Sequence, residues 1–266
     1  EPDFNVQEVL ESCAAGIRDR GLARRLIEVL PTLEVAERDY VALGSRAKLF
    51  EIATSKDVAG SVSSAEMSTL YKGTLSRQGS RARRFYDRLK TAAPNDICPL
   101  CGQRVVKTLD HYLPKATYPT FALTPLNLVP ACSDCNKSKL DRQPVDAGDQ
   151  TLHPYFDNVD GVSWLVAEIR ESSPPAAVFS VRLPANIHVD ATTVARLKVH
   201  FETLGLGQLY AAQAGSEMVS IRFALAEAAA ARGVEGVQAL LEYQARTRTL
   251  AARNSWVAAL YTALAE

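Results

Sequence analysis

The sequence predicts an α+β protein that is mainly helical, with a small irregular module between two helical regions. Apolar residues recur every three or four positions up to about residue 93, and again from about residue 190 to the end. Between residues 94 and 154 this helical period disappears and prolines become frequent. The chain has 266 residues, of which 47% are apolar and 23% charged. It can therefore bury a sizeable core in one to three compact units, and disorder is excluded as its main state.

Residues 1–94 are expected to form an N-terminal helical region. Its apolar positions follow helical spacing from Val6 to Leu43 and include Cys13, which we interpret as a core residue rather than a reactive thiol. We expect the helical pattern to break near Pro31 and again between residues 55 and 63.

Two further helix starts are predicted in the same region. Ser63 and Glu66 have the spacing of a capping box, which predicts a helix that begins there. Ser80 is the expected N-cap of another helix, which continues to Lys90.

Residues 95–157 are expected to form a distinct small module. Its apolar runs at 105–109 and 126–129 are short enough to be strands. Residues 133–140 predict a short helix with Ser133 as its N-cap. The predicted order is therefore strand, strand, helix.

Residues 158–266 predict a β-hairpin followed by helices. The β-rich runs 162–170 and 177–182 are separated by a Ser- and Pro-containing loop, and Asp190 is expected to cap a helix that continues to Leu204. The remaining helices are expected at 209–231, 234–251 and 255–265. We expect His188 and His200 in this region to be structural or exposed.

The charge balance excludes a strong global field, because 30 Lys and Arg residues face 30 Asp and Glu residues. Any basic surface must therefore be local. No stretch approaches the roughly 18 to 20 apolar residues of a membrane helix, and the first residues lack the pattern of a signal peptide. We therefore expect a cytoplasmic protein that does not contact a membrane.

Four of the five cysteines form two CxxC pairs. Cys98 and Cys101 are followed, after a gap of 30 residues, by Cys132 and Cys135. The two-residue spacing lets each pair reach one ion from a tight turn, and four thiolates are typical of a closed structural zinc site. We therefore predict one Zn²⁺ that stabilises the module, since a unit of about sixty residues has little core of its own.

Further polar residues lie beside the cysteines. They are Asp110, His111, Asn127 and Asn136. Bringing the two CxxC pairs to one ion draws Asp110, His111 and Asn136 to the same end of the module. A carboxylate, an amide oxygen and an imidazole at one place suit a hard divalent cation with an adjacent general base.

The segments Asp110-His-Tyr-Leu-Pro114 and Asn127-Leu-Val-Pro-Ala-Cys-Ser-Asp-Cys-Asn-Lys-Ser-Lys139 resemble the HNH endonucleases, in the branch braced by zinc. The resemblance covers about residues 95–156. It implies a ββα-metal fold and hydrolysis of phosphodiester bonds in nucleic acid. Similar proteins occur in bacterial phage defence and in restriction of modified DNA, which is a statement about the family.

The resemblance also implies roles for single residues. His111 would be the general base that activates water, Asp110 and Asn136 the ligands of the catalytic metal, and Asn127 the residue that fixes the loop behind His111. The last position is Asn136 instead of His, which makes an HNN form. Oxygen ligands favour Mg²⁺ or Mn²⁺ over softer metals.

Several basic residues are candidates for contacts with DNA. Lys137 and Lys139 are expected at the N-terminal end of the short helix, where backbone N–H groups also meet phosphate. Residues 72–90 carry seven bases and one acid, and the expected backbone contacts include Arg81, Arg83 and Arg84. Solvated surface positions are the alternative for each of these residues.

Two points remain open at this level. His153, in a His-Pro-Tyr-Phe-Asp segment found after this motif in similar bacterial proteins, either borders the site or belongs to a packing segment. The function is predicted to be metal-dependent cleavage of DNA, with a non-catalytic zinc-binding adaptor and an RNA-cutting toxin as alternatives. Because the helical flanks carry no recognisable chemistry, we expect them to bind a partner protein or a second copy of the chain.

Overall fold

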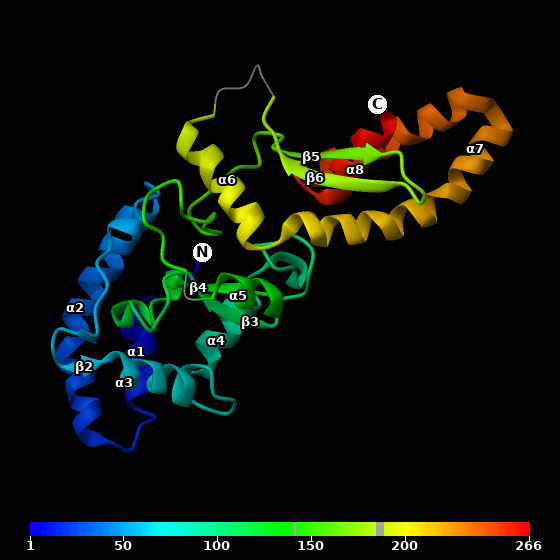
Figure 1. Cartoon of the computed structure of the whole chain (residues 1–266). Coiled ribbons are helices and arrows are strands. Elements are labelled where there is room, and N and C mark those ends of the chain that lie inside the picture. Colours follow the sequence, from blue (N-terminus) through cyan, green and yellow to red (C-terminus); the bar gives the residue numbers. More distant parts are fainter. Residues whose placement is uncertain (141, 185–188) are drawn as a thin grey trace. The chain divides into compact units, whose positions relative to one another are not determined.

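The computed structural model describes residues 1–140, 142–184 and 189–266, so His188 lies outside the described residues. It confirms an α+β fold that is mainly helical (Figure 1). The chain divides into two compact units, residues 1–157 and residues 158–266. No helix in the described part of the chain has the length and apolarity needed to cross a membrane.

Unit 1 begins with two packed helices, α1 (Val6–Ala14) and α2 (Arg20–Gly44). The expected break near Pro31 is wrong, because α2 continues through this residue. A proline inside a helix leaves the carbonyl four residues earlier without its N–H partner. That residue is Ile27, and both Ile27 and Pro31 are exposed, so water can hydrate the freed carbonyl.

The next part of unit 1 is a short hairpin followed by helices. Ser63 is the N-cap of α3, and its side chain and that of Glu66 form the predicted capping box. Ser80 accepts a hydrogen bond from the Arg83 N–H, but the helix α4 itself begins at Arg83, later than expected. The elements are η1 (Leu49–Glu51), β1 (Asp57–Val58), β2 (Val62–Ser63), α3 (Ser64–Leu70), the π-helix η2 (Tyr71–Leu75), α4 (Arg83–Lys90) and η3 (Pro94–Asp96).

The module then forms the predicted ββα order with β3 (Thr108–His111), β4 (Leu128–Ala131) and α5 (Ser133–Lys139). The strands pair antiparallel, and the loop between them contains η4 (Pro119–Phe121) and η5 (Pro125–Asn127). The N-cap of α5 is Cys132, one residue before the expected Ser133, because the Cys132 sulfur accepts the Cys135 N–H.

The module and the N-terminal helices share one hydrophobic core. Leu109, Leu123 and Leu128 of the module belong to the same buried cluster as side chains of α1 to α4. Cys13 is fully buried in this cluster, as predicted, and burial raises its pKa to about 11. Each buried leucine contributes roughly 1.5–3 kcal/mol to stability, so the module is stabilised by these helices as well as by its own residues.

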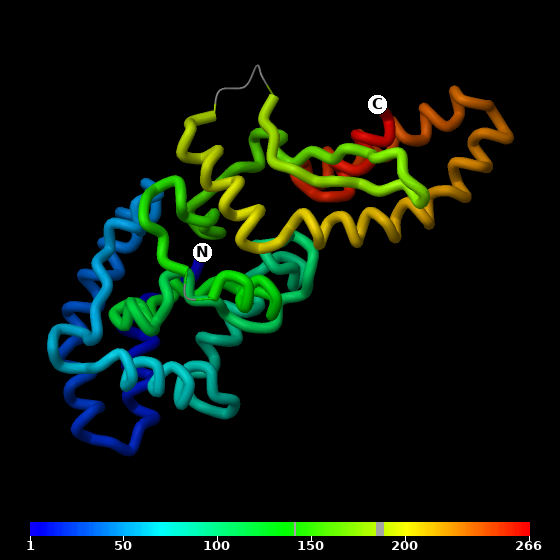
Figure 2. Tube along the Cα trace, viewed as in Figure 1, coloured from blue at the N-terminus to red at the C-terminus, as the bar shows by residue number. Residues whose placement is uncertain are grey.

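The described residues of unit 2 form the predicted hairpin and three helices. Its elements are β5 (Leu165–Arg170), β6 (Ala176–Val181), α6 (Ala191–Thr203), α7 (Leu206–Ala251) and α8 (Trp256–Ala265). Asp190 caps α6 as expected. The helix α7 contains a kink at Gly233, whose positive φ of 62° favours glycine, and its trace turns back along itself (Figure 2). The helices α7 and α8 pack together and against the hairpin.

Candidate active site

Four cysteine sulfurs meet in one buried cluster. The Sγ atoms of Cys98, Cys101, Cys132 and Cys135 all lie within 4.8 Å of one another. A tetrahedral Zn²⁺ with Zn–S distances near 2.3 Å places its sulfurs about 3.8 Å apart, so the cluster has the size that zinc requires. The first pair follows η3 and the second pair opens α5, which brings the two ends of the module together.

The protonation of the cluster also fits a cation. Hydrogen bonds from Cys135 and Cys98 lower the pKa of Cys101 to about 2. The same contacts act in the opposite direction on its neighbours: the interaction with Cys101 raises the pKa of Cys98 to about 12 and also raises that of Cys135. Several thiolates cannot share this space unless a cation balances their charge, and Zn²⁺ supplies that charge.

His111 lies at the end of β3 and is only 6% exposed. Its Nε2 is 3.0 Å from the Ala122 carbonyl oxygen, and its ring packs edge-on against Tyr71 with ring centroids 4.5 Å apart. A carbonyl accepts hydrogen bonds but cannot donate them, so Nε2 carries the proton and Nδ1 keeps its lone pair. Burial lowers the pKa of His111 to about 3, so the ring is neutral at pH 7.

Asn127 is fully buried at the base of the loop that joins the two strands. Its Nδ2 donates to the carbonyls of Leu113 and Phe121, at 3.0 Å each. Its Oδ1 accepts from the Leu113 N–H at 2.7 Å and from the Tyr40 hydroxyl at 3.0 Å. The side chain therefore connects the beginning of the loop to the residue before Ala122.

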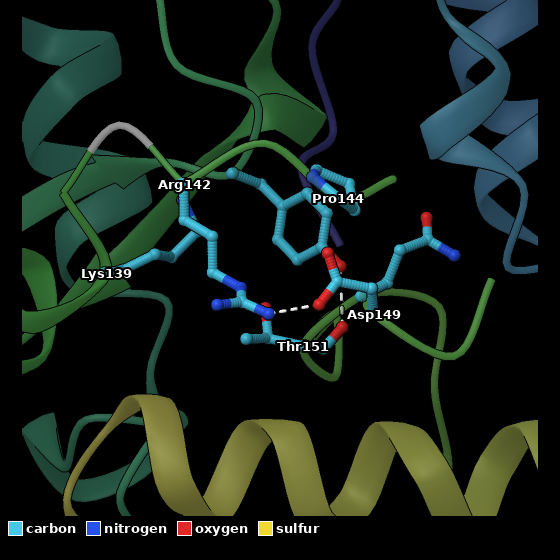
Figure 3. A pocket seen from close by; sticks show the side chains of 7 residues that line it. Lys139, Arg142, Pro144, Asp149 and Thr151 are labelled. Atoms are coloured by element: carbon cyan, nitrogen blue, oxygen red, sulfur yellow. Dashed lines mark hydrogen bonds and ion pairs between the residues drawn. The ribbon is translucent and has the colours of Figure 1, made fainter. Parts of the chain in front are cut away.

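Asp110 is 4% exposed and forms a buried ion pair with Lys139. The Lys139 ammonium is 3.1 Å from Asp110 Oδ2 and donates to the His111 carbonyl at 2.8 Å. Burial raises the pKa of Asp110, and the charge of Lys139 opposes that effect. Figure 3 shows a small hollow that Lys139 also lines, where Arg142 and Asp149 form an ion pair.

This position of Lys139 differs from the expected one. Lys137 and Lys139 lie in the last turn of α5, away from its free N–H groups, so the expected phosphate site at a helix N-terminus is wrong. Lys137 is exposed, whereas Lys139 is 5% exposed and its ammonium is already held by Asp110. A contact with phosphate is therefore retained as a proposal for Lys137 only.

A cleft of about 620 Å³ opens beside β3. Asp110, His111 and Asn136 all line it, so the fold brings the predicted base and the two predicted metal ligands to one cavity. Asn127 lies behind this wall. The other lining residues include Tyr71, Tyr86, Lys115 and Lys137.

The oxygen atoms of Asp110 and Asn136 suit Mg²⁺ or Mn²⁺, because these hard cations prefer carboxylate and amide ligands and keep several waters. One oxygen of Asp110 faces Lys139, which leaves its Oδ1 as the candidate ligand. Such an ion would stabilise the negative charge that develops on a phosphate and on a leaving oxygen.

The basic segment 72–90 borders the cleft through Ser76 and Tyr86. Arg81 and Arg84 are exposed, and neither pairs with an acid among the described residues. Arg83 differs, because its side chain is only 19% exposed and its guanidinium forms an ion pair with Asp87 at 2.8 Å and donates to the Ser76 carbonyl. Arg83 therefore stabilises the segment internally.

His153 is 1% exposed and is not among the side chains that line the cleft. Its Nε2 is 3.1 Å from the Tyr40 hydroxyl of α2, and its ring lies 4.3 Å from that of Tyr112. The segment 153–157 thus packs behind the site. His200, expected to be structural or exposed, is buried in α6.

Three residues near the site were not predicted from the sequence. They are Tyr40, Tyr71 and Lys115. Each occupies a position with ordinary helical or loop spacing, so no local signal distinguished them. The role of Lys139 was also missed, although its spacing of three residues from Asn136 places both on one side of a helix.

Comparisons with known proteins agree with this geometry. A family model described as HNH endonuclease matches residues 98–142, which contain the four cysteines and all four candidate catalytic residues. The chain is 30% identical over 230 residues to protein ea31 of Escherichia phage lambda, across 83% of this chain and 77% of the phage protein. No solved structure matches the chain. With its four clustered cysteines and its ββα unit, the chain belongs to the HNH endonuclease family.

Proposed function

We propose that this protein is a metal-dependent endonuclease that hydrolyses phosphodiester bonds of DNA. The observation that carries the proposal is His111, whose Nε2 is held by the Ala122 carbonyl while the ring lines a cleft shared with Asp110 and Asn136. A neutral imidazole with a fixed tautomer is what a general base requires.

In this proposal each side chain has one task. His111 Nδ1 takes a proton from the attacking water, because the proton on Nε2 is held by the carbonyl. Asp110 and Asn136 would hold Mg²⁺ or Mn²⁺, which would stabilise the charge on the phosphate. Lys137 and Lys115, both at the cleft, contribute positive charge near the backbone of the DNA.

The basic segment supports a nucleic-acid substrate. Lys72, Arg77, Arg81 and Arg84 are exposed beside the residues that border the cleft. They offer four cations in a protein of zero net charge, so the affinity for DNA should be modest and independent of sequence. We expect a partner protein or self-association through the helical flanks to supply targeting, which mass in solution and specific activity together would test.

The decisive experiment is a plasmid-nicking assay with Mg²⁺, Mn²⁺ or EDTA, comparing wild type with His111→Ala. We expect cleavage by wild type with either metal, none with EDTA, and a loss of cleavage in His111→Ala with zinc content and DNA affinity retained. Supercoiled, linear and single-stranded DNA and RNA are tested side by side. Preference for RNA would overturn the DNA assignment, and binding without cleavage of any substrate would favour a non-catalytic adaptor.

The proposed setting is bacterial defence against phage or restriction of modified DNA, supported only by the family resemblance. Cells that express the wild-type protein should restrict plaque formation, whereas cells that express His111→Ala should not. Equal plaque numbers in both strains would argue against this setting.

A further inference from the structure

We propose that Tyr40 and His153 are positioning residues of this site: they hold Asn127, and through it the loop whose Ala122 carbonyl fixes the tautomer of His111. The role of His111 rests on the proposed function. Tyr40 and His153 both lie outside residues 98–142, which the family model matches. The inference therefore extends the site to α2 and to the segment after the module.

The network begins at His153. The Tyr155 N–H donates to His153 Nδ1 at 3.2 Å, so the ring proton resides on Nε2. His153 Nε2 is 3.1 Å from the Tyr40 oxygen, which must therefore accept this hydrogen bond. The Tyr40 hydroxyl then has its own proton available, and it donates that proton to Asn127 Oδ1 at 3.0 Å.

All three side chains are enclosed. Tyr40 and Asn127 are fully buried and His153 is 1% exposed. A hydrogen bond between groups withdrawn from water is costly to leave unmade, so the direction of each bond is fixed by its neighbours. Rings of Phe121 and Phe156 pack against Tyr40, with centroids at 5.2 and 6.0 Å, and limit its movement.

Asn127 transmits this order to the loop. With the Tyr40 hydroxyl in place, Oδ1 accepts two hydrogen bonds and Nδ2 donates two, which uses the full capacity of the amide. A rotated amide would place two donors against donors and two acceptors against acceptors. The amide therefore has one orientation, and in that orientation it holds the Phe121 carbonyl.

The last step is the carbonyl of the next residue, Ala122, which receives His111 Nε2. If the loop shifts by a few tenths of an ångström, this hydrogen bond weakens. The neutral ring can then adopt the other tautomer, in which the proton lies on Nδ1 instead of Nε2. That tautomer has no lone pair at the atom that faces the substrate water. Tyr40 and His153 thus act on the base without touching it.

The test compares Tyr40→Phe with Tyr261→Phe in the full-length, zinc-loaded protein. Tyr261 is a matched control in unit 2: it is 1% exposed, and its hydroxyl donates a partly buried hydrogen bond to Glu217. Nitrogen-15 NMR reports the tautomer of His111, whose signals are assigned by their loss in His111→Asn. Steady-state cleavage with Mg²⁺ and DNA in excess supplies kcat and KM.

We expect the Nε2–H tautomer of His111 in wild type and in Tyr261→Phe, and a mixture of tautomers in Tyr40→Phe. The kcat of Tyr40→Phe should fall about tenfold, as expected for the loss of one buried hydrogen bond, with KM unchanged. A merely structural role for Tyr40 would lower the melting temperature and leave both the tautomer and kcat of the folded protein unchanged. That result would overturn the inference.

A second pair of variants keeps the test decisive if Tyr40→Phe fails to fold. His153→Gln keeps an N–H donor for Tyr40, whereas His153→Leu does not. We expect His153→Gln to retain the wild-type tautomer and most of kcat, and His153→Leu to behave like Tyr40→Phe. Equal behaviour of the two would overturn the inference. If wild type cleaves nothing, the proposed function fails, but the tautomer measurement still decides the positioning.

Discussion

Gly44, the last residue of α2, is predicted to be the contact point that lets the segment 153–157 dock on this helix. A Cβ atom added at Gly44 would lie 2.2, 2.5 and 2.8 Å from three ring atoms of Phe156. Carbon atoms in contact are ordinarily about 3.5–4.0 Å apart, so in Gly44→Ala the ring must withdraw by more than about 1 Å. The ring cannot do this alone, because it also packs against Tyr40 and His153.

The expected magnitude follows from two opposing effects. Forcing an extra carbon into a packed contact costs about 1–3 kcal/mol. Alanine has a helix propensity better than that of glycine by at most about 1 kcal/mol, and less at a helix end. The free energy of unfolding of unit 1 should therefore fall by about 1–2 kcal/mol, which lowers its Tm by roughly 2–8 °C for a unit of this size.

Scanning calorimetry of Gly44→Ala and Gly73→Ala measures this difference. Gly73 is a matched control in the π-helix η2, because an added Cβ there meets no atom within 4 Å. We expect Gly73→Ala to keep or slightly raise the Tm. If Gly44→Ala has the same Tm as wild type or as Gly73→Ala, the docking of Phe156 on α2 is not the contact that the structure describes.

Three further predictions concern zinc, acid and salt. Cys101→Ser should lose the bound Zn²⁺ and unfold the module, because metal binding and folding are one event in small sites; a folded variant with one zinc by elemental analysis would contradict this. Hydrogen bonds from Arg25 lower the pKa of Glu66 from 4.5 to about 2, so its stabilising contribution is full above about pH 4.5 and is lost as the pH falls towards 2. The Tm difference between wild type and Glu66→Gln should therefore stay constant above about pH 4.5 and shrink as the pH falls from there towards 2, and a difference that does not change in this range would refute the assignment. The double variant of Arg81→Glu and Arg84→Glu should weaken DNA binding and flatten its salt dependence, whereas the same charge change at exposed arginines of unit 2 should not; equal effects would make the segment an ordinary solvated surface.

Much of the fold was predictable because the signals for it are local. A capping box joins residues three apart, as Ser63 and Glu66 do, and a CxxC pair contains its own turn. The ββα order and the hairpin of unit 2 likewise depend on short runs of residues whose side-chain pattern indicates a strand or a helix. The clustering of Asp110, His111 and Asn136 at one cleft could be expected, because two cysteine pairs that bind one ion draw these three residues to the same end of the module.

By itself, then, the sequence determined the metal-binding cysteines, the order of the elements and the chemistry available at the end of β3. Only the tertiary structure decided what surrounds these groups. The continuation of α2 through Pro31, the burial of Lys139 against Asp110 and the contact of Tyr40 with Asn127 all join residues to distant partners or to solvent. Spacing along the chain carries no information about such contacts, because packing of the whole core decides which side of a helix faces water and which polar group meets a buried partner.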